Sequence, residues 1–352
     1  MLQNNSTKLN WDIGTGYDLF ISLIALHNPE SYGLRASWAA GVRSRLPVED
    51  RQTLETVYLL MFSPLHLVHG LPKPKSAATV LQKLASIPES KRLEAVSLQP
   101  NTPDSVSGIL QGSISRKKWT SAEKNVLAEA YHIEGRSVTP TQLELLYQTW
   151  THREKFGHDY LKALTAYVES FFLEEEQRIL PVLKQGLSHA QMRAGSLPLP
   201  AMLEELSSGV RFEELANISK IYLAPSFWGT PFLFYQHLDN DTMLMLYGAR
   251  PDNMALTPGE VVPDSLLRGL KALADPTRLR ILRSLAQTPQ TAAQLSRALR
   301  LRPPTVAHHL MELRMAGMVQ ITITTEGERH YATRYEGFDT NQDLLNRFVH
   351  GE

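Results

Sequence analysis

Basic and polar side chains recur at helical spacing between residues 302 and 314 of this 352-residue chain. Pro303 favours the start of a helix there, because proline is well tolerated in the first helical turn. Thr305 and His308 would lie one turn apart near that start, where base edges of DNA are usually read. Arg302 is better placed for a phosphate, since a guanidinium group can donate two parallel hydrogen bonds to it. We predict that Arg302, Thr305, His308 and Arg314 contact double-stranded DNA; the alternative is an ordinary solvated helix face.

Two further candidates lie at the tip of a predicted β-hairpin. Residues 318–324 and 328–334 are predicted strands, and a tight turn of Thr325, Glu326, Gly327 and Glu328 separates them. Such a hairpin can reach the DNA backbone or the minor groove beside a helix that lies in the major groove. Thr325 and Arg329 are therefore predicted to bind DNA, although the two flanking glutamates would repel phosphate locally.

Short helices are predicted to position these side chains. An opening helix from residue 265 is followed by a second helix, which Asp275 caps and Pro276 begins. A third helix covers residues 291–299, and residues 300–302 make the turn into the helix at Pro303. Apolar residues on that last helix and just after it recur at helical spacing and point inward: Val306, Leu310, Leu313 and Met318. Helices, a turn and a hairpin in this order form a winged helix-turn-helix.

Charge is unevenly distributed along the chain, although the formal net charge is zero. Residues 265–334 hold eleven Lys or Arg against four acidic residues, a net charge of +7, whereas residues 1–264 have a net charge of −4. A compact basic module attracts the phosphates of nucleic acid. The charge distribution therefore favours DNA binding over a contact with protein alone.

Three sequence segments resemble the DNA-binding domain of the ArsR/SmtB family of bacterial transcriptional regulators: LADPTRLRIL (273–282), QLSRALRLRPPTVAHHLMELRMAGMV (294–319) and EGERHY (326–331). The whole chain also resembles a subgroup in which a large helical region precedes the winged helix, through DLFISLIALHNP and LRASWAAGVRSRLP. The resemblance implies a homodimer that binds DNA. Ala307 stands where the family often has serine, so one polar contact to DNA is absent.

Metal sensing, which occurs in this family, is not expected. Metal-sensing members carry two thiols at positions that match Thr291 and Ala293, and this chain has no cysteine at all. Other members pair Asp and His residues along a C-terminal helix. Here Asp343 and His350 lack the second pair, so we predict no metal and no cofactor.

The region before the basic module is predicted to be mostly helical. Thr139 and Pro140, for example, are typical of a helix start. We expect a mainly α fold with small β elements: a helical domain (1–215), a small antiparallel sheet of about three strands packed on it (216–250), a linker (251–264) and the winged helix-turn-helix (265–352). The frequent aromatic residues suggest a pocket for a small-molecule effector, with Trp150, Phe227, Trp228 and Phe232 as its candidate lining.

Several classes of protein are excluded or disfavoured. No apolar run approaches the ~18 residues of a membrane-spanning helix, and there is no secretory signal, so we expect a cytoplasmic protein. Motifs for nucleotide binding, metalloproteases and serine hydrolases are absent, so no catalytic residue is predicted. We therefore expect a homodimeric transcriptional regulator, in particular a repressor of a pseudo-palindromic operator. The alternative is an enzyme or ligand-sequestering module that the winged helix tethers to DNA.

Overall fold

The computed structural model describes residues 7–60, 63–116, 118–131, 138–212, 215, 218–252, 254–257, 262–325 and 327–350. The chain forms two compact units that are interleaved along the sequence. Unit 1 comprises Met1–Pro181, Ile218–Ala224 and Tyr235–Met245, and unit 2 comprises Val182–Asn217, Pro225–Phe234 and Leu246–Glu352. Compact units of this kind do not mark domain ends by themselves, so the predicted limits at residues 215, 250 and 264 stay predictions.

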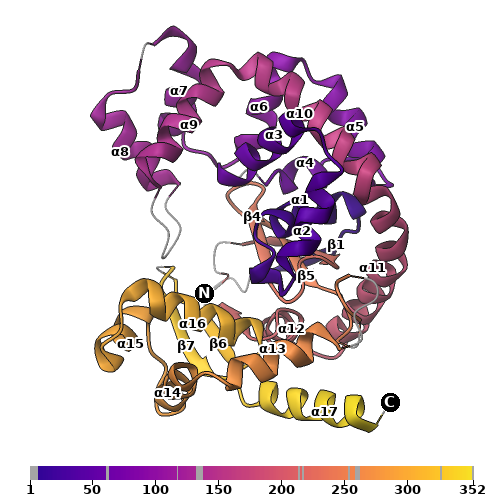
Figure 1. Ribbon diagram of the computed structural model, residues 1–352, viewed down its shortest axis with the longest axis vertical. Helices are drawn as coiled ribbons and strands as arrows, with labels where there is room; N and C mark the ends of the chain where they lie inside the picture. Colours follow the sequence, from indigo (N-terminus) through magenta and orange to yellow (C-terminus); the bar gives the residue numbers. More distant parts are fainter. Residues whose placement is uncertain are drawn as a thin grey trace, which may run out of the picture. The chain divides into compact units, whose positions relative to one another are not determined.

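Unit 1 is built mainly of helices, coloured indigo to magenta in Figure 1. They are α1 (Thr15–His27), α2 (Ala36–Ser44), α3 (Val48–Leu59), α4 (Leu65–His69), α5 (Ala77–Ser86), α6 (Glu89–Ser97), α7 (Asp104–Gln111), α8 (Ser121–Ala130), α9 (Pro140–Thr151) and α10 (Arg153–Tyr167). A π-helical segment (Val168–Phe172) joins α10 to α11 (Leu173–Ala194), which ends in unit 2. In the described part of the chain, no helix combines the length and apolar character needed to cross a membrane.

Local signals account for several of these helices. Thr139 caps α9 as predicted: its hydroxyl accepts a hydrogen bond from the Gln142 N–H, while the Gln142 side chain accepts one from the Thr139 N–H. This reciprocal pair satisfies two N–H groups that a helix start otherwise leaves unpaired. Helix α1 has buried residues on all of its sides, among them Asp18 and Ser22, which explains why its sequence has no separate polar side.

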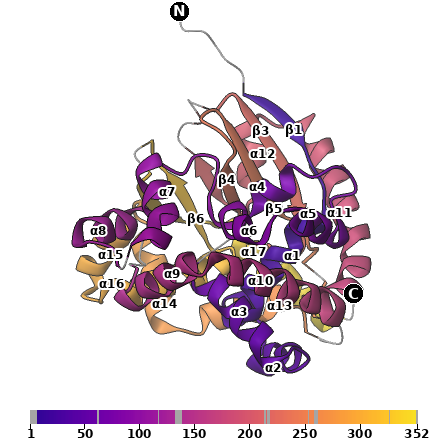
Figure 2. The same cartoon turned by 90° about the horizontal axis from the view of Figure 1, so that it is seen from above.

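The predicted small sheet is present and has the strand order β1-β3-β5-β4 (Figure 2). Its strands are β1 (Lys8–Trp11), β3 (Lys220–Ser226), β4 (Phe234–His237) and β5 (Thr242–Gly248). The edge strand β1 was not predicted. It pairs with β3 in parallel, with Lys8 opposite Lys220 and Trp11 opposite Leu223. Because of this parallel pair, the sheet is not wholly antiparallel as predicted.

A buried ionic cluster holds β1 in unit 1. Asp12 follows β1 directly and has only 4% of its surface exposed. Its Oδ2 accepts hydrogen bonds from the hydroxyl of Tyr17 (2.6 Å), from Nδ1 of His69 (3.2 Å) and from the ammonium group of Lys75. Burial alone would raise the pKa of Asp12, but these three donors together lower it to about 2. The cluster ties the end of β1 to α1, to α4 and to the segment before α5.

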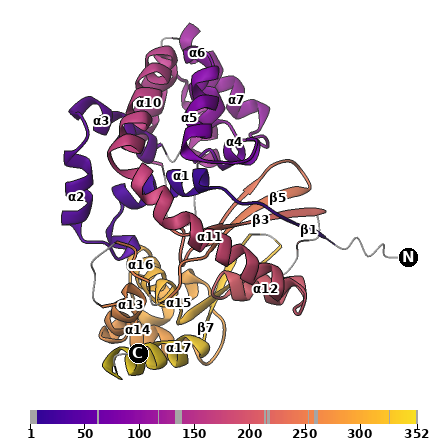
Figure 3. The ribbon, with the colours of Figure 1, turned by 90° about the vertical axis from the view of Figure 1, so that its right-hand side faces the viewer.

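Unit 2 contains the winged helix, coloured orange and yellow in Figure 3. Its elements are α13 (Asp264–Leu273), α14 (Pro276–Leu285), α15 (Ala292–Leu299), α16 (Pro303–Met315), β6 (Val319–Ile323), β7 (Arg329–Thr333) and α17 (Glu336–His350). The predicted inward residues Val306, Leu310, Leu313 and Met318 all lie in one buried cluster. Asp275 caps α14 by accepting hydrogen bonds from the N–H groups of Thr277 (2.7 Å) and Arg278 (3.0 Å).

The wing is a three-stranded sheet, not a simple hairpin. Strand β2 (Val210–Phe212), which follows α12 (Leu199–Leu206), pairs in parallel with β6, and β6 pairs antiparallel with β7. Val210 lies opposite Ile321, and the Ile321 N–H donates to the carbonyl of Gly209 (2.9 Å). Gly209 has a φ of +106°, a conformation that side chains with a Cβ rarely adopt. A segment about 110 residues earlier in the sequence is thus part of the wing.

The described residues of the predicted linker 251–264 are packed against unit 2. The guanidinium of Arg250 donates to the carbonyl of Met254 (2.8 Å) and to the carboxylate of Asp264 (3.2 Å), where α13 begins. The same carboxylate accepts the Leu256 N–H (2.7 Å), and Leu256 has no exposed surface. Residues 253 and 258–261 lie outside the described residues.

Candidate nucleic-acid interface

Helix α16 has one buried and one exposed side. Val306, Leu310 and Leu313 pack into the core of the winged helix. Arg302, Thr305 and His308 are exposed on the other side, with Arg302 at the N-cap position. Their exposure agrees with what the sequence predicts, and their contact with DNA stays a prediction. A helix that presents such side chains at its N-terminal end fits the major groove.

Two more arginines, Arg297 and Arg300, lie in the last turn of α15 and at its C-cap. Arg300 ends α15 in a left-handed conformation with a φ of +56°. The hydroxyl of Ser296 donates to the carbonyl of Leu301 (2.6 Å), which fixes the turn. Arg297 and Arg300 are exposed like Arg302. Neither residue was predicted from the sequence to contact DNA, although the three closely spaced arginines of RALRLR (297–302) were an available signal.

Arg314 lies elsewhere than predicted. It is buried, and its guanidinium donates to the backbone carbonyls of Ser208 (3.1 Å) and Ser207, just before β2. Burial, with a smaller contribution from Arg334, lowers the pKa of Arg314 to about 10. The reason for the difference is helical geometry: Arg314 follows Thr305 by nine residues, about 2.5 turns, and therefore lies on the opposite side of α16. Its role is to join α16 to the β2 segment.

The tip of the wing carries the other two predicted residues. Thr325 is exposed and Arg329 is partly exposed, at the start of β7. Gly327, with a φ of +82°, makes the turn between the strands. Glu328 interacts with Nε2 of His330 (3.0 Å), and Glu326 lies outside the described residues. Thr325 and Arg329 therefore lie at the tip of the wing as the sequence predicts, and their contact with DNA stays a prediction.

The four aromatic residues predicted to line an effector pocket do not form a single site within either unit. Trp150 belongs to unit 1, and Phe227, Trp228 and Phe232 belong to unit 2. The first three have no exposed surface. Phe232 packs against Phe234, with ring centroids 5.9 Å apart. Their structural role is packing, and none of them lines the cavity of about 320 Å³ beside α6 and α7.

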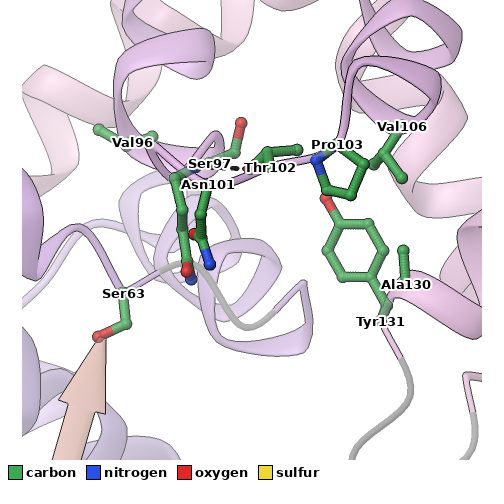
Figure 4. A pocket seen from close by; sticks show the side chains of 10 residues that line it. Ser63, Val96, Ser97, Asn101, Thr102, Pro103, Val106, Ala130 and Tyr131 are labelled. Carbon is green, nitrogen blue, oxygen red and sulfur yellow. Dashed lines mark hydrogen bonds between the residues drawn. The ribbon is translucent and has the colours of Figure 1, made fainter. Parts of the chain in front are cut away.

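Unit 1 has a cavity of about 320 Å³ beside α6 and α7, lined by polar and apolar residues alike (Figure 4). Among the described residues that line it, none is charged, and the polar ones include Asn101, Thr102 and Tyr131. Tyr131 extends towards Pro103, and burial raises the pKa of its hydroxyl to about 12, so this group stays protonated. Among the described residues, no group of three His, Asp or Glu side chains is arranged to hold a metal ion.

Comparison with known proteins identifies the helix-turn-helix. Residues 275–320 match the family model described as bacterial regulatory protein, arsR family. This segment covers α14, α15, α16 and the first residues of β6, and so includes the exposed side of α16. No curated protein and no solved structure matches the chain. The winged helix of unit 2 is therefore an ArsR-family helix-turn-helix, and the chain is a DNA-binding transcriptional regulator with a large N-terminal region.

Proposed function

We propose that the chain is a homodimeric repressor whose two α16 helices enter successive major grooves of a pseudo-palindromic operator. The observation that carries this proposal is the exposed row Arg302, Thr305 and His308, with Arg297 and Arg300 beside it. Half-sites about 10 bp apart would match the two-fold symmetry of such a dimer. The tip of the wing would bind the adjacent backbone through Thr325 and Arg329.

Apolar side chains on α13 and α17 support the dimer. Leu267 and Leu270 of α13 are exposed, as are Phe348 and Val349 at the end of α17. Exposed apolar residues on two helices that contact each other favour burial against a partner. A second copy is the simplest partner, because a two-fold dimer uses the same surface on both subunits.

The region before the winged helix has a regulatory role in this proposal, not an enzymatic one. A small-molecule effector that binds two arrangements of the winged helices unequally would change the affinity for DNA. Strand β2 and Arg314 provide a physical connection, since they join the segment after α12 to the wing and to α16. Repression follows if the effector-free arrangement is the one that fits the operator.

Fluorescence anisotropy tests the proposal directly. The full chain is titrated into its own upstream DNA and into a scrambled duplex of equal length, across a salt series. We expect a preference of about 10³ or more for the upstream site, together with a steep salt dependence. Absence of binding even at low salt would overturn the proposal and favour an enzymatic or ligand-sequestering role. Sedimentation of the protein alone measures whether it is a dimer.

A further inference from the structure

Two apolar side chains lie beside the exposed polar row of α16. Met311 follows His308 by three residues and Thr305 by six, and 37% of its surface is exposed. At about 3.6 residues per turn, these three side chains lie within about 120° of one another around the helix. Ala307 is partly exposed and lies one turn before Met311, so the two are neighbours on the helix surface. The core of the winged helix, as far as its residues are described, contains neither of them.

The position of Met311 distinguishes it from other exposed apolar residues. Single exposed apolar residues are common on protein surfaces and need no explanation of their own. Met311, however, belongs to the helix-turn-helix segment 275–320 and lies on the side of α16 that enters the major groove in the proposed function. Lysine or arginine there would attract phosphate, and a polar side chain could hydrogen-bond to a base edge. Methionine is suited to neither contact, so the group on DNA that it binds must be apolar.

The major groove offers one apolar group, the C5-methyl of thymine. The edges of adenine, guanine and cytosine present hydrogen-bond donors and acceptors there, and only thymine adds a methyl group. An unbranched, flexible methionine side chain can cover such a group without a fixed geometry. Met311 lies about 4.5 Å further along the helix axis than His308, which is comparable with the spacing of about 3.4 Å between successive base pairs. It would therefore reach the base pair next to the one that His308 contacts.

We propose that Met311 determines part of the sequence specificity by contacting the C5-methyl group of a thymine in each half-site. The inference rests on the proposed function, because it requires α16 to lie in the major groove. It adds a base that the DNA must contain: a thymine next to the base pair that His308 contacts. Cytosine at that position lacks the methyl group and is disfavoured. Ala307, beside Met311, widens the apolar surface that faces this methyl group.

The first experiment defines the site without assuming where it lies in a genome. The full chain selects bound duplexes from a pool with a random central segment, and the enriched sequence is then made with each thymine in turn replaced by deoxyuridine. Deoxyuridine pairs with adenine as thymine does and lacks only the C5-methyl group. Fluorescence anisotropy should show a loss of affinity of about three- to fivefold at one thymine of each half-site, as expected when one methyl group is no longer buried.

Variants of Met311 assign the methyl contact to this side chain. Met311→Ala should bind the thymine-containing site about three- to fivefold more weakly than the parent and show no further loss at that deoxyuridine. Met311→Leu retains an apolar side chain and should keep most of the difference between thymine and deoxyuridine. Met192→Ala removes an exposed methionine of α11; it is the matched control and should respond to deoxyuridine as the parent does. Thermal unfolding shows whether each variant is folded.

The outcomes separate this inference from the proposed function. Specific binding that no deoxyuridine weakens would overturn the methyl contact and leave the proposed function standing. An equal response of the parent and Met311→Ala would assign the methyl group to another side chain and overturn the role of Met311. Loss of the dimer on sedimentation of Met311→Ala would place Met311 at a protein contact instead. A chain that enriches no sequence from the pool would overturn the proposed function, and this inference with it.

Discussion

Charged side chains are buried and paired in one region of this protein and exposed in another. In unit 1, Asp12 and Lys75 are buried together, and Tyr17 and His69 complete the hydrogen bonds of the carboxylate. In unit 2, the end of α15 and the turn into α16 expose Arg297, Arg300 and Arg302, and these side chains form no ion pair or hydrogen bond with the described residues. Buried charges with internal partners hold the fold, whereas exposed charges without them remain available to an external anion such as DNA.

The largest effect is expected at the buried cluster. Asp12→Asn removes the negative charge and leaves the ammonium of Lys75 buried without its counterion. Removing one partner of a buried pair costs about 3–5 kcal/mol of stability, because the other charge is left unpaired. Urea unfolding of the full chain measures this loss. Asp159→Asn, which removes a surface ion pair with Lys155, is the control and should lie within experimental error of the parent.

Lowering the pH should remove much of the stabilisation that the Asp12 carboxylate provides. The pKa of Asp12 is lowered from its ordinary 3.8 to about 2, so the unfolded chain takes up a proton at higher pH than the folded one. The stabilisation is therefore complete above about pH 4 and is lost as the pH falls towards 2; it amounts to roughly 2 kcal/mol. The stability difference between the parent and Asp12→Asn, measured from pH 7 to pH 2, should narrow over that interval. A difference that is constant with pH would contradict this account.

Substitution of Arg314 tests the contrast between buried and exposed charges within one helix, α16. Arg314→Met retains a long side chain but deprives the carbonyls of Ser207 and Ser208 of their donor. We expect a loss of about 1–3 kcal/mol in unfolding free energy, since buried acceptors are left unsatisfied. The folded variant should keep the affinity and salt dependence of the parent for DNA. Weaker DNA binding at unchanged stability would instead place Arg314 at the interface, as the sequence first predicts.

Features that depend on residues close in sequence could be predicted, whereas contacts between distant segments could not. The caps at Thr139 and Asp275 and the buried apolar side of α16 depend on residues a few positions apart, and the sequence predicts them correctly. The pairing of β1 with β3 joins segments more than 200 residues apart, and β2 is only three residues long. Neither leaves a pattern that a single sequence can reveal. The wrong prediction for Arg314 could have been avoided from the sequence. Arg314 follows Thr305 by about 2.5 helical turns, so it lies on the opposite, buried side of α16.

The last prediction separates the two roles on the exposed side of α16. His308→Ala should reduce the preference for the upstream site by about tenfold, because base contacts carry the sequence information. Arg302→Ala should weaken binding to specific and scrambled DNA alike, and the slope of log K against log salt should become shallower by about 0.9, since one phosphate contact is lost. Both variants should unfold like the parent, because neither side chain is buried. If both variants also bind DNA like the parent, the exposed side of α16 does not recognise DNA. The exposed charges of unit 2 would then have no role in DNA binding, in contrast to the structural role of the buried cluster in unit 1.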